Sequence, residues 1–492
     1  MKKIILGISL LLNTQAWALS CGTSVTFSEP GQMFVQPQLA INDQGEAVAV
    51  WVSLEKDIAE KKLFAATRNA EQKWSSEDVL HSAKVIVPTE LFIDAKGNSF
   101  ITWRNNEDQE EKLIELYQFA KKEKNNPWSP IVTLLTSMDN ITDPKMTFDA
   151  NGDVHIFGIS TIEDPRSRYD KVLGGHYLHQ LAQKKQTELS KDFWYTSFEV
   201  LTKNKQGQAF AFWCEKSAKT EFKVLKGAWS QDNSTWSDPV YIYQLKDDTA
   251  FYTHRSQVMN LKGDVGILWL SNDLNHSRKK VQVITCFDRH SSEPLDLAIS
   301  KKDYSSLSIA LNDEKYIAAC WEEFDHENSK IYVVDKSPGQ LWSSPIVLAD
   351  SKAIEHLRMS MDPQGNILVA WFVHEKNNLM LYAAYKPVNK PWVTPVSLSD
   401  EIEDCEELNL SWNNKDHFVV AWDQEGNNVY SIHGAALSTK TEKWSYAQLS
   451  PEGKDCEEFA VAFNEKGQGI MSWITKKSSE ESDIQIAELK ID

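Results

Sequence analysis

The stretch "LAINDQGEAVAVW" at 39–51 decides the fold of this chain. Apolar residues alternate with other residues on both sides of the central "NDQG", and this period of two predicts two strands that each bury one face. Between the strands, Asn caps its own backbone and Gly accepts the positive φ of a tight turn. The stretch therefore predicts a β-hairpin.

The template of this hairpin recurs nine times, at steps of 50–56 residues. It consists of Asn or Asp, then Gly three residues later and Trp nine residues later. The first position is always filled, by Asn42, Asp94, Asp149, Asn204, Asn260, Asn312, Asp362, Asn413 and Asn464. Lys315 and Asp416 replace the Gly in two copies, and Gly158 replaces the Trp in the third. A period of this length is typical of solenoids, propellers or arrays.

Two further apolar runs follow most of the hairpins, for example "KLFAATRN" at 62–69 in the first unit and "WSPIVTLL" at 128–135 in the second. Four antiparallel strands in such a unit make a propeller blade, with the Trp side chains filling the wedges between blades. We predict an all-β chain in which 19–492 form one closed propeller of nine four-stranded blades, with eight blades as the alternative. The blade hairpins are expected to start near 36, 87, 142, 195, 253, 304, 355, 405 and 456.

The ninth unit lacks a fourth strand, because the chain ends with its third, "DIQIAELKI" at 483–491. A spare strand, "TSVTFSEP" at 23–30, precedes the first hairpin. Pairing between these two segments joins the chain ends and removes exposed sheet edges. We therefore expect the strand at 23–30 to complete the last blade and close the ring.

The first eighteen residues are expected to be a signal peptide, because Lys2 and Lys3 precede the apolar run "IILGISLLL" and the small residues of "AWA" follow at 16–18. This predicts an exported, periplasmic or secreted protein. In the alternative interpretation "ALSC" at 18–21 is a lipoprotein box, which would anchor the protein through a lipid on Cys21. No later stretch is long and apolar enough to predict a transmembrane segment. The net charge of −18 argues against nucleic acid and anionic lipid as partners, and we expect a monomer.

The segment "SQDNSTWSDPV" at 230–240 resembles the Asp-box of sialidase-superfamily propellers, which runs Ser-x-Asp-x-Gly-x-Thr-Trp. Ser230, Asp232, Thr235 and Trp236 match it, although the segment is one residue short and lacks the Gly. The resemblance implies the propeller fold of bacterial secreted repeat proteins. Sialidase activity would also require three arginines around a carboxylate; of the eight arginines, Arg255 and Arg358 fall at suitable places and no third does.

Two cysteines occupy equivalent places in the last two units. Cys405 and Cys456 each lie seventeen residues before their hairpin Trp, where the chain enters the innermost strand, and acidic pairs follow both. Export would place the thiols in an oxidising compartment, so a disulfide between them is a candidate, alongside free thiols, a Cys–Glu metal site and a catalytic thiol. Buried inert thiols are expected for Cys214, Cys286 and Cys320.

The same entrance in the other blades defines a set of candidate binding residues at the mouth of the central channel. Convergent polar groups at a concave mouth are the default site in this architecture; the alternative is a solvated rim without a ligand. The candidates are Asp143, Glu199, His254, Arg255, His356, Arg358, Glu406, Glu407, Glu457 and Glu458.

Three functions follow from these patterns. The chain contains no HExxH, CxxC, Walker, GxGxxG or GxSxG motif, so no catalytic residue, metal or cofactor is predicted. The first hypothesis is therefore a non-enzymatic scaffold that binds a protein or a glycan at the channel mouth or on a blade surface. The alternatives are a sialidase-like or other propeller hydrolase with a rim active site, and a lipid-tethered envelope assembly factor.

Overall fold

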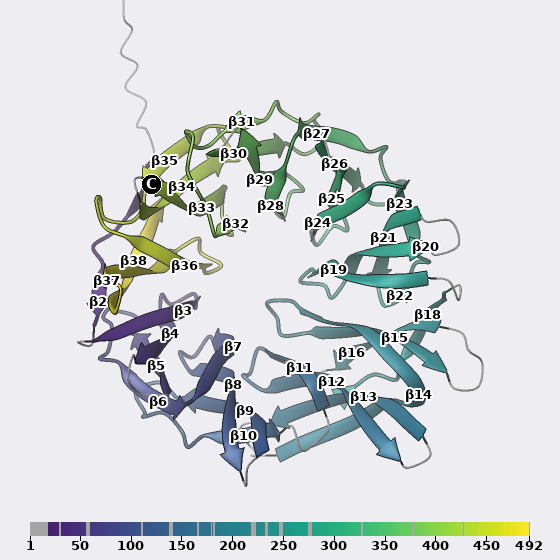
Figure 1. Ribbon diagram of the computed structural model, residues 1–492, viewed down its shortest axis with the longest axis horizontal. Helices are drawn as coiled ribbons and strands as arrows, with labels where there is room; N and C mark the ends of the chain where they lie inside the picture. Colours follow the sequence, from purple (N-terminus) through teal and green to yellow (C-terminus); the bar gives the residue numbers. More distant parts are fainter. Residues whose placement is uncertain are drawn as a thin grey trace, which may run out of the picture.

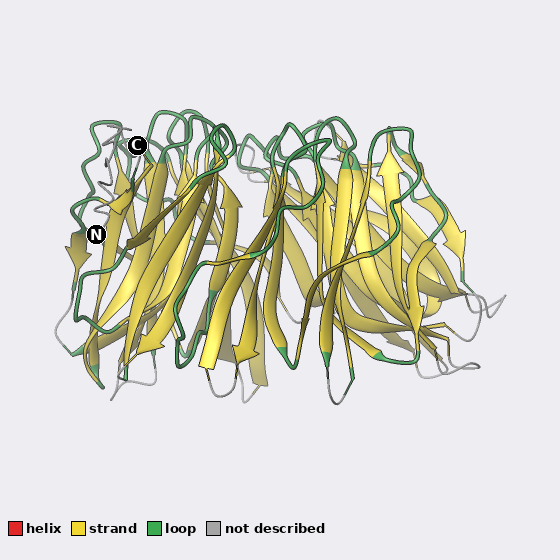
Figure 2. Cartoon of the chain, turned by 90° about the horizontal axis from the view of Figure 1, so that it is seen from above, coloured by secondary structure: helices red, strands yellow, loops and turns green. Residues whose placement is uncertain are grey.

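The computed structural model describes residues 18–28, 31–55, 60–109, 112–136, 141–164, 167–178, 180, 183–217, 223–231, 235–245, 249–273, 278–325, 328–375, 378–426 and 428–491. They form a ring of nine four-stranded blades (Figure 1). Seen from the side, the strands run between two faces that carry the loops (Figure 2). Within the described ranges there is no helix, and hence none long and apolar enough to cross a membrane. The nine-bladed propeller is confirmed, and the eight-bladed alternative is wrong.

Most blades are separate antiparallel sheets whose first strand lies innermost in the ring (Figure 1). Blades 1 and 2 consist of β3 (Gln32–Ile41), β4 (Ala47–Glu55), β5 (Lys61–Arg68) and β6 (Asp78–Ala83), and of β7 (Val85–Ile93), β8 (Ser99–Gln109), β9 (Lys112–Lys122) and β10 (Val132–Thr136). Blades 5 and 6 consist of β19 (Thr249–Met259), β20 (Val265–Asp273), β21 (Arg278–Phe287), β22 (His290–Ser291) and β23 (Leu295–Ser300), and of β24 (Asp303–Leu311), β25 (Ile317–Phe324), β26 (Ser329–Lys336) and β27 (Ile346–Ser351). Blades 7 and 8 consist of β28 (Ile354–Met361), β29 (Ile367–Glu375), β30 (Asn378–Lys386) and β31 (Val396–Ser397), and of β32 (Leu408–Trp412), β33 (His417–Gly426), β34 (Val429–Ser438) and β35 (Trp444–Gln448).

Blades 3 and 4 are joined by one long strand, β14 (Gln183–Lys203), so that they form a single eight-stranded sheet. The first half of β14 pairs with β13 as the outer strand of blade 3, and its second half pairs with β15 as the inner strand of blade 4. The other strands of this sheet are β11 (Ile141–Phe148), β12 (Val154–Asp164), β13 (Ser167–Leu178), β15 (Ala209–Ser217), β16 (Lys223–Gln231), β17 (Thr235–Trp236) and β18 (Val240–Gln244).

Blade 9 is completed by the beginning of the chain. Its strands β36 (Cys456–Phe463), β37 (Gly469–Ser478) and β38 (Glu481–Ile491) are joined by β2 (Val25–Phe27), which pairs antiparallel with β38. The strand predicted at 23–30 therefore closes the ring, as expected. A second short strand, β1 (Leu19–Cys21), also pairs with β38, and the sequence pattern did not indicate it.

The hairpin Trp side chains form the cores between blades. Trp103 of blade 2 packs with Val50 and Leu63 of blade 1, and Trp51 of blade 1 packs with Ile484 of blade 9. Both indoles are essentially inaccessible to solvent. Because an aromatic side chain buries about 150–250 Å², each such wedge contributes about 4–6 kcal/mol of transfer free energy. The repeated Trp thus holds neighbouring blades together, as the repeat predicts.

The turn of each hairpin has the geometry that its residues suggest. In the first blade the Asn42 carboxamide oxygen accepts hydrogen bonds from the Gln44 and Glu46 amides, and Gly45 has a φ of 78°. Lys315, which replaces Gly in the sixth blade, also adopts a positive φ of 64°. The turn of the sixth blade therefore keeps a left-handed residue at the Gly position although a side chain makes it unfavourable, whereas in the eighth blade Asn414 has the positive φ, 62°.

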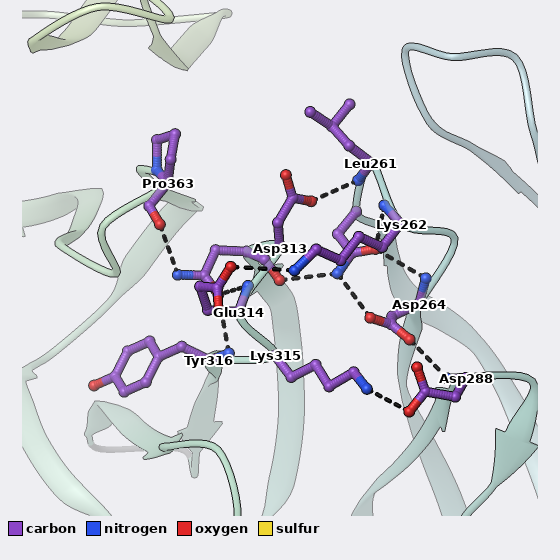
Figure 3. Close-up of polar contacts among 11 residues, drawn as sticks. Leu261, Lys262, Asp264, Asp288, Asp313, Glu314, Lys315, Tyr316 and Pro363 are labelled. Atoms are coloured by element: carbon purple, nitrogen blue, oxygen red, sulfur yellow. Dashed lines mark hydrogen bonds and ion pairs between the residues drawn. The ribbon is translucent and has the colours of Figure 1, made fainter.

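The turn asparagines also join neighbouring blades. In five blades the Nδ2 of this Asn donates to a main-chain carbonyl in the turn of the next blade, and we call these contacts the inter-blade amide bonds. In the eighth blade Asn414 donates to the Asn464 carbonyl instead. Asn260 donates to the carbonyl of Asn312, and Asn312 donates to the carbonyl of Pro363, which is labelled in Figure 3. The inter-blade amide bond of the last blade closes the ring, because Asn464 of blade 9 donates to the carbonyl of Asn42 in blade 1 at 2.8 Å. An Asp at this position has no such donor, so the Asn or Asp of the repeat is not interchangeable between blades.

Candidate functional site: the central channel

The innermost strands bend near their first residues, where most of the predicted rim residues lie. The pairing register with the second strand shifts at this place in eight of the blades, which marks β-bulges. Four bulge residues that are not Gly adopt a positive φ: Gln36, Ser306, His356 and Glu458. A bulge re-aims the side chains beside it. The equivalent places that the repeat alignment predicts are therefore real, and they lie at a strained part of the strand.

In blade 8 a buried carboxylate replaces the strand pairing at this place. Asp423, on β33, is fully buried, and its Oδ1 accepts hydrogen bonds from the amides of Glu406 (3.0 Å) and Glu407 (2.9 Å). The Cys405 sulfur lies 3.3 Å from the same oxygen and 3.3 Å from the Glu407 carbonyl oxygen. Burial and the Asp423 charge raise the pKa of the Cys405 thiol. This cysteine is therefore a protonated hydrogen-bond donor and a poor nucleophile.

Cys456 lies in a different core between blades from Cys405. Cys405 packs with residues of blades 7 and 8, whereas Cys456 packs between blades 8 and 9 and its sulfur lies 3.5 Å from Thr475 Oγ1. Burial raises the pKa of the Cys456 thiol too. Both cysteines are free, so the candidate disulfide is not formed in this structure.

Two of the rim glutamates bind the bulge of the next blade. Glu407 Oε2 accepts from the Phe459 amide of blade 9 at 3.1 Å, and Glu458 Oε2 accepts from the Gln36 amide of blade 1 at 2.6 Å. Burial raises the pKa of Glu407 to about 7, and the nearby Asp423, Glu458 and Glu406 charges act in the same direction. Burial also raises the pKa values of Glu458 and Glu406. This acidic arc, Glu406, Glu407, Glu457 and Glu458, thus joins blades 8, 9 and 1.

Within the acidic arc, Glu457 forms an ion pair with Lys476 on β37. The remaining rim candidates do not converge on this arc. His356 packs edge-on against Phe372 of its own blade, and Arg358 Nη1 donates to the carbonyl of Leu357 at 3.1 Å. His254 is exposed. The backbones of Asp143 and Glu199 belong to β11 and β14, but their side chains lie outside what the structure describes.

One rim candidate, Arg255, lines a cavity of about 580 Å³ that spans blades 2 to 5. We call this the cationic cavity, because its wall carries four basic side chains and one carboxylate. The charged residues are Arg104 of β8, Lys145 of β11, Lys203 of β14, Arg255 of β19 and Glu90 of β7. Of these residues only Arg255 was predicted from the sequence, although the innermost strands did show polar residues alternating with apolar ones.

Two ion pairs hold part of this wall in place. Lys203 pairs with Glu90, so the inner strands of blades 4 and 2 are connected across blade 3. Arg104 Nη1 lies 3.1 Å from Glu115 Oε1, and the same carboxylate accepts a hydrogen bond from the Tyr117 hydroxyl at 3.0 Å. These contacts fix the positions of charged groups in the wall of the cationic cavity.

The turn side of the ring is crossed by a lysine. Lys205 Nζ, in the turn between β14 and β15, lies 2.7 Å from Asn414 Oδ1 of blade 8 and 2.8 Å from Glu465 Oε1 of blade 9. A second cavity of about 650 Å³ lies beside these turns, and its wall includes Lys203, Phe92 and Phe463. Because Lys203 lines both cavities, they are neighbouring parts of one channel, whose turn side is narrowed by Lys205.

A metal centre has no support in this geometry. Among the residues that the structure describes, no group of three or more His, Cys, Asp or Glu side chains is placed to hold a metal ion. The Cys–Glu arrangement at 405–407 is occupied by its own hydrogen bonds. The Asp-box-like segment lies between β16 and β17, and its Asp232 is outside the described residues.

Comparison with known proteins shows similarity at the level of the propeller. No family model and no curated protein sequence matches the chain. Solved structures that resemble it include a polysaccharide lyase of the PL25 ulvan lyase family (12% identity, TM-score 0.42, covering 80% of this chain and 91% of that one). Another is the propeller domain of the Trilobed protease from Pyrococcus furiosus (10% identity, TM-score 0.35, covering 75% of this chain and 97% of that one). A third is the α-L-arabinanase of Penicillium chrysogenum (13% identity, TM-score 0.31, covering 62% of this chain and 95% of that one). At these identities and scores, the activities of those proteins do not transfer to this chain.

Proposed function

We propose that this protein is a non-enzymatic propeller that binds a glycan or protein ligand in its central channel. The observation that carries the proposal is the cationic cavity, in which polar side chains from four consecutive blades face a space of about 580 Å³. A cavity of 300–1,000 Å³ with a few well-placed polar groups has the size and character of a ligand site.

The partners of the acidic arc support binding rather than catalysis. Glu407 and Glu458 accept hydrogen bonds from main-chain amides of the next blade, and Glu457 is paired with Lys476. These carboxylates are therefore engaged in joining the blades. The thiols of Cys405 and Cys456 are buried with raised pKa values, which opposes nucleophilic attack.

A hydrolase is the second candidate, and one observation favours it. A glutamate whose pKa is raised to about 7, as for Glu407, suits general acid catalysis at neutral pH. Turnover of glycosides or lactones that is lost in Glu407→Gln would support the hydrolase and would refute the non-enzymatic proposal. The matched control is Glu457→Gln, which changes a neighbouring carboxylate that is already paired with Lys476.

We further propose that the protein is exported and cleaved after Ala18. Leu19 would then be the first residue; its side chain is buried with blades 8 and 9, and its nitrogen donates to Ser445 Oγ at 2.7 Å. Lipidation of Cys21 would instead remove Leu19 and Ser20, which pair with Ile491 and Lys490. Burial also raises the pKa of the Cys21 thiol to about 12. The intact mass of the exported protein tests this: a chain beginning at Leu19 is expected, and a lipidated chain beginning at Cys21 would support the tethered assembly factor instead.

Binding is best tested with a panel of oligosaccharides and peptides, by isothermal titration calorimetry together with assays of the products. The proposal predicts saturable binding without turnover. It is refuted if a bound compound is converted to product, or if ligands compete for an outer blade surface and leave the channel free.

A further inference from the structure

We infer that the ligand of the cationic cavity is an acidic oligosaccharide, one that carries carboxylate or sulfate groups along its length. This inference rests on the proposed binding function and names its ligand class. The wall of the cavity holds four basic groups, of which Arg104 and Lys203 are paired with Glu115 and Glu90, whereas the whole chain has a formal net charge of −18. A local reversal of charge inside a concave site attracts anions and raises their local concentration.

The arrangement of the charges favours a polymer over a single small anion. Arg104, Lys145, Lys203 and Arg255 come from blades 2, 3, 4 and 5 in turn. They are therefore spread along an arc of the channel instead of being gathered around one point. A chain of sugars with a charge on successive units can meet such an arc, and guanidinium groups suit carboxylate and sulfate because they donate two parallel hydrogen bonds.

Neutral hydrogen-bonding groups lie among these charges. The hydroxyls of Thr89, Thr147, Thr202 and Tyr117 and the amide of Gln257 belong to the same wall. Hydroxyl and amide groups recognise sugar hydroxyls, so this mixture favours an acidic glycan over an acidic peptide.

The opposite part of the ring excludes an anion. The acidic arc belongs to blades 8 and 9, whose inner strands β32 and β36 lie across the ring from β11 and β19 (Figure 1). Repulsion from these carboxylates would hold a polyanion on the wall made by blades 2 to 5. The acidic arc and the cationic cavity therefore place negative and positive charge on opposite sides of the channel. This arrangement favours a negatively charged ligand and directs it to the wall made by blades 2 to 5.

The test uses four probes: an oligogalacturonate, a sulfated dextran oligosaccharide, a neutral malto-oligosaccharide and polyglutamate. Calorimetry is expected to show binding of one or both acidic sugars that weakens as salt is raised, and little binding of the other two probes. The carboxylated and sulfated probes distinguish the two sources of negative charge.

Variants then place the binding in the cationic cavity. Lys145→Gln combined with Arg255→Gln is expected to weaken binding of the acidic sugar by about tenfold or more, because the two substitutions remove two charged hydrogen-bond donors from the wall. Lys390→Gln, a matched charge change at an exposed residue paired with Glu442, is expected to bind as the unmodified protein does. Equal thermal melting of all three proteins shows that the fold is kept.

The outcomes separate this inference from the proposed function. Preference for the neutral sugar or for polyglutamate, or unchanged affinity in the double variant, overturns the acidic glycan while leaving a binding propeller. Absence of binding to every probe and to the wider panel of glycans and peptides overturns both.

Discussion

Replacing Asn464 with Asp would test the bond that closes the ring. The Asn464 side chain is 3% exposed; its Nδ2 donates to the Asn42 carbonyl at 2.8 Å and to Gln468 Oε1 at 2.7 Å. Its Oδ1 accepts from the Lys466 and Gln468 amides, at 3.1 and 2.9 Å. Asn464→Asp keeps the accepting oxygen and the turn, and it removes both donated bonds.

The expected loss follows from these two bonds. Each contributes about 1 kcal/mol, so the free energy of unfolding falls by about 2 kcal/mol. The unfolding entropy of roughly 470 residues is about 1 kcal/mol per kelvin, and the melting temperature should therefore fall by about 2 °C. The Asn42 carbonyl keeps its bond from the Gly45 amide, which limits the loss.

A second change separates the local bond from the inter-blade bond. In two of the three turns that have Asp, an Asn four residues later donates to it: Asn98 Nδ2 to Asp94 at 2.8 Å, and Asn366 Nδ2 to Asp362 at 2.6 Å. Adding Gln468→Asn to Asn464→Asp should restore this local bond, but it cannot restore the bond to Asn42.

The assay is thermal unfolding followed by circular dichroism, at matched protein concentration and pH. The double variant should melt about midway between the single variant and the unmodified protein. Equal melting of the single variant and the unmodified protein would refute the role of this bond in ring closure. Full recovery in the double variant would show that only the local contact matters.

Three further predictions concern the closing strand, the rim and the thiols. Phe27→Ala should lower the free energy of unfolding by about 3–5 kcal/mol, because the Phe27 ring is buried and its centroid lies 5.1 Å from that of the Trp51 indole. Val25→Ala on the same strand should change the melting temperature little, because Val25 is exposed. Similar melting of the two variants would contradict closure of the ring by β2. Folding raises the pKa of Glu407 to about 7, so the protonated side chain contributes fully to stability below its unfolded pKa of about 4.3, and this contribution is lost as pH rises through 7. Between these two pH values the melting temperature should therefore fall less steeply in Glu407→Gln than in the unmodified protein. An unchanged slope would disprove the shift. Thiol titration in guanidinium should count six free cysteines, and four would show a bond between Cys405 and Cys456 under those conditions.

Much of the fold could be predicted because its information is local and repeated. Alternation of apolar residues, a turn with Gly and a buried Trp recur in almost every unit, so the number of blades and the strand that completes the last one followed from counting. The short strand at Leu19–Cys21 was missed because three residues carry no period. The shared strand β14 was also missed, since the sequence has no turn signal that distinguishes one long strand from two.

The site was harder to predict, because its residues converge only through the curvature of the ring. The alignment of units located the bulges and found Arg255, but it gave no information about which partner each side chain takes. The rim residues Glu407 and Glu458 bind amides of the next blade, and Asp423, 17 residues after Glu406 on a second strand, occupies the place expected for strand pairing. Arg104 and Lys203 were missed because each looks like an ordinary polar residue of its strand, and only the assembled channel places them on one wall.

A crystal structure with a bound acidic oligosaccharide would test the central claim most directly. We predict density for the sugar inside the channel, against Lys145 and Arg255 on the inner strands of blades 3 and 5. A ligand seated on the outer surface of a blade, or on the carboxylates of blades 8 and 9, would contradict it.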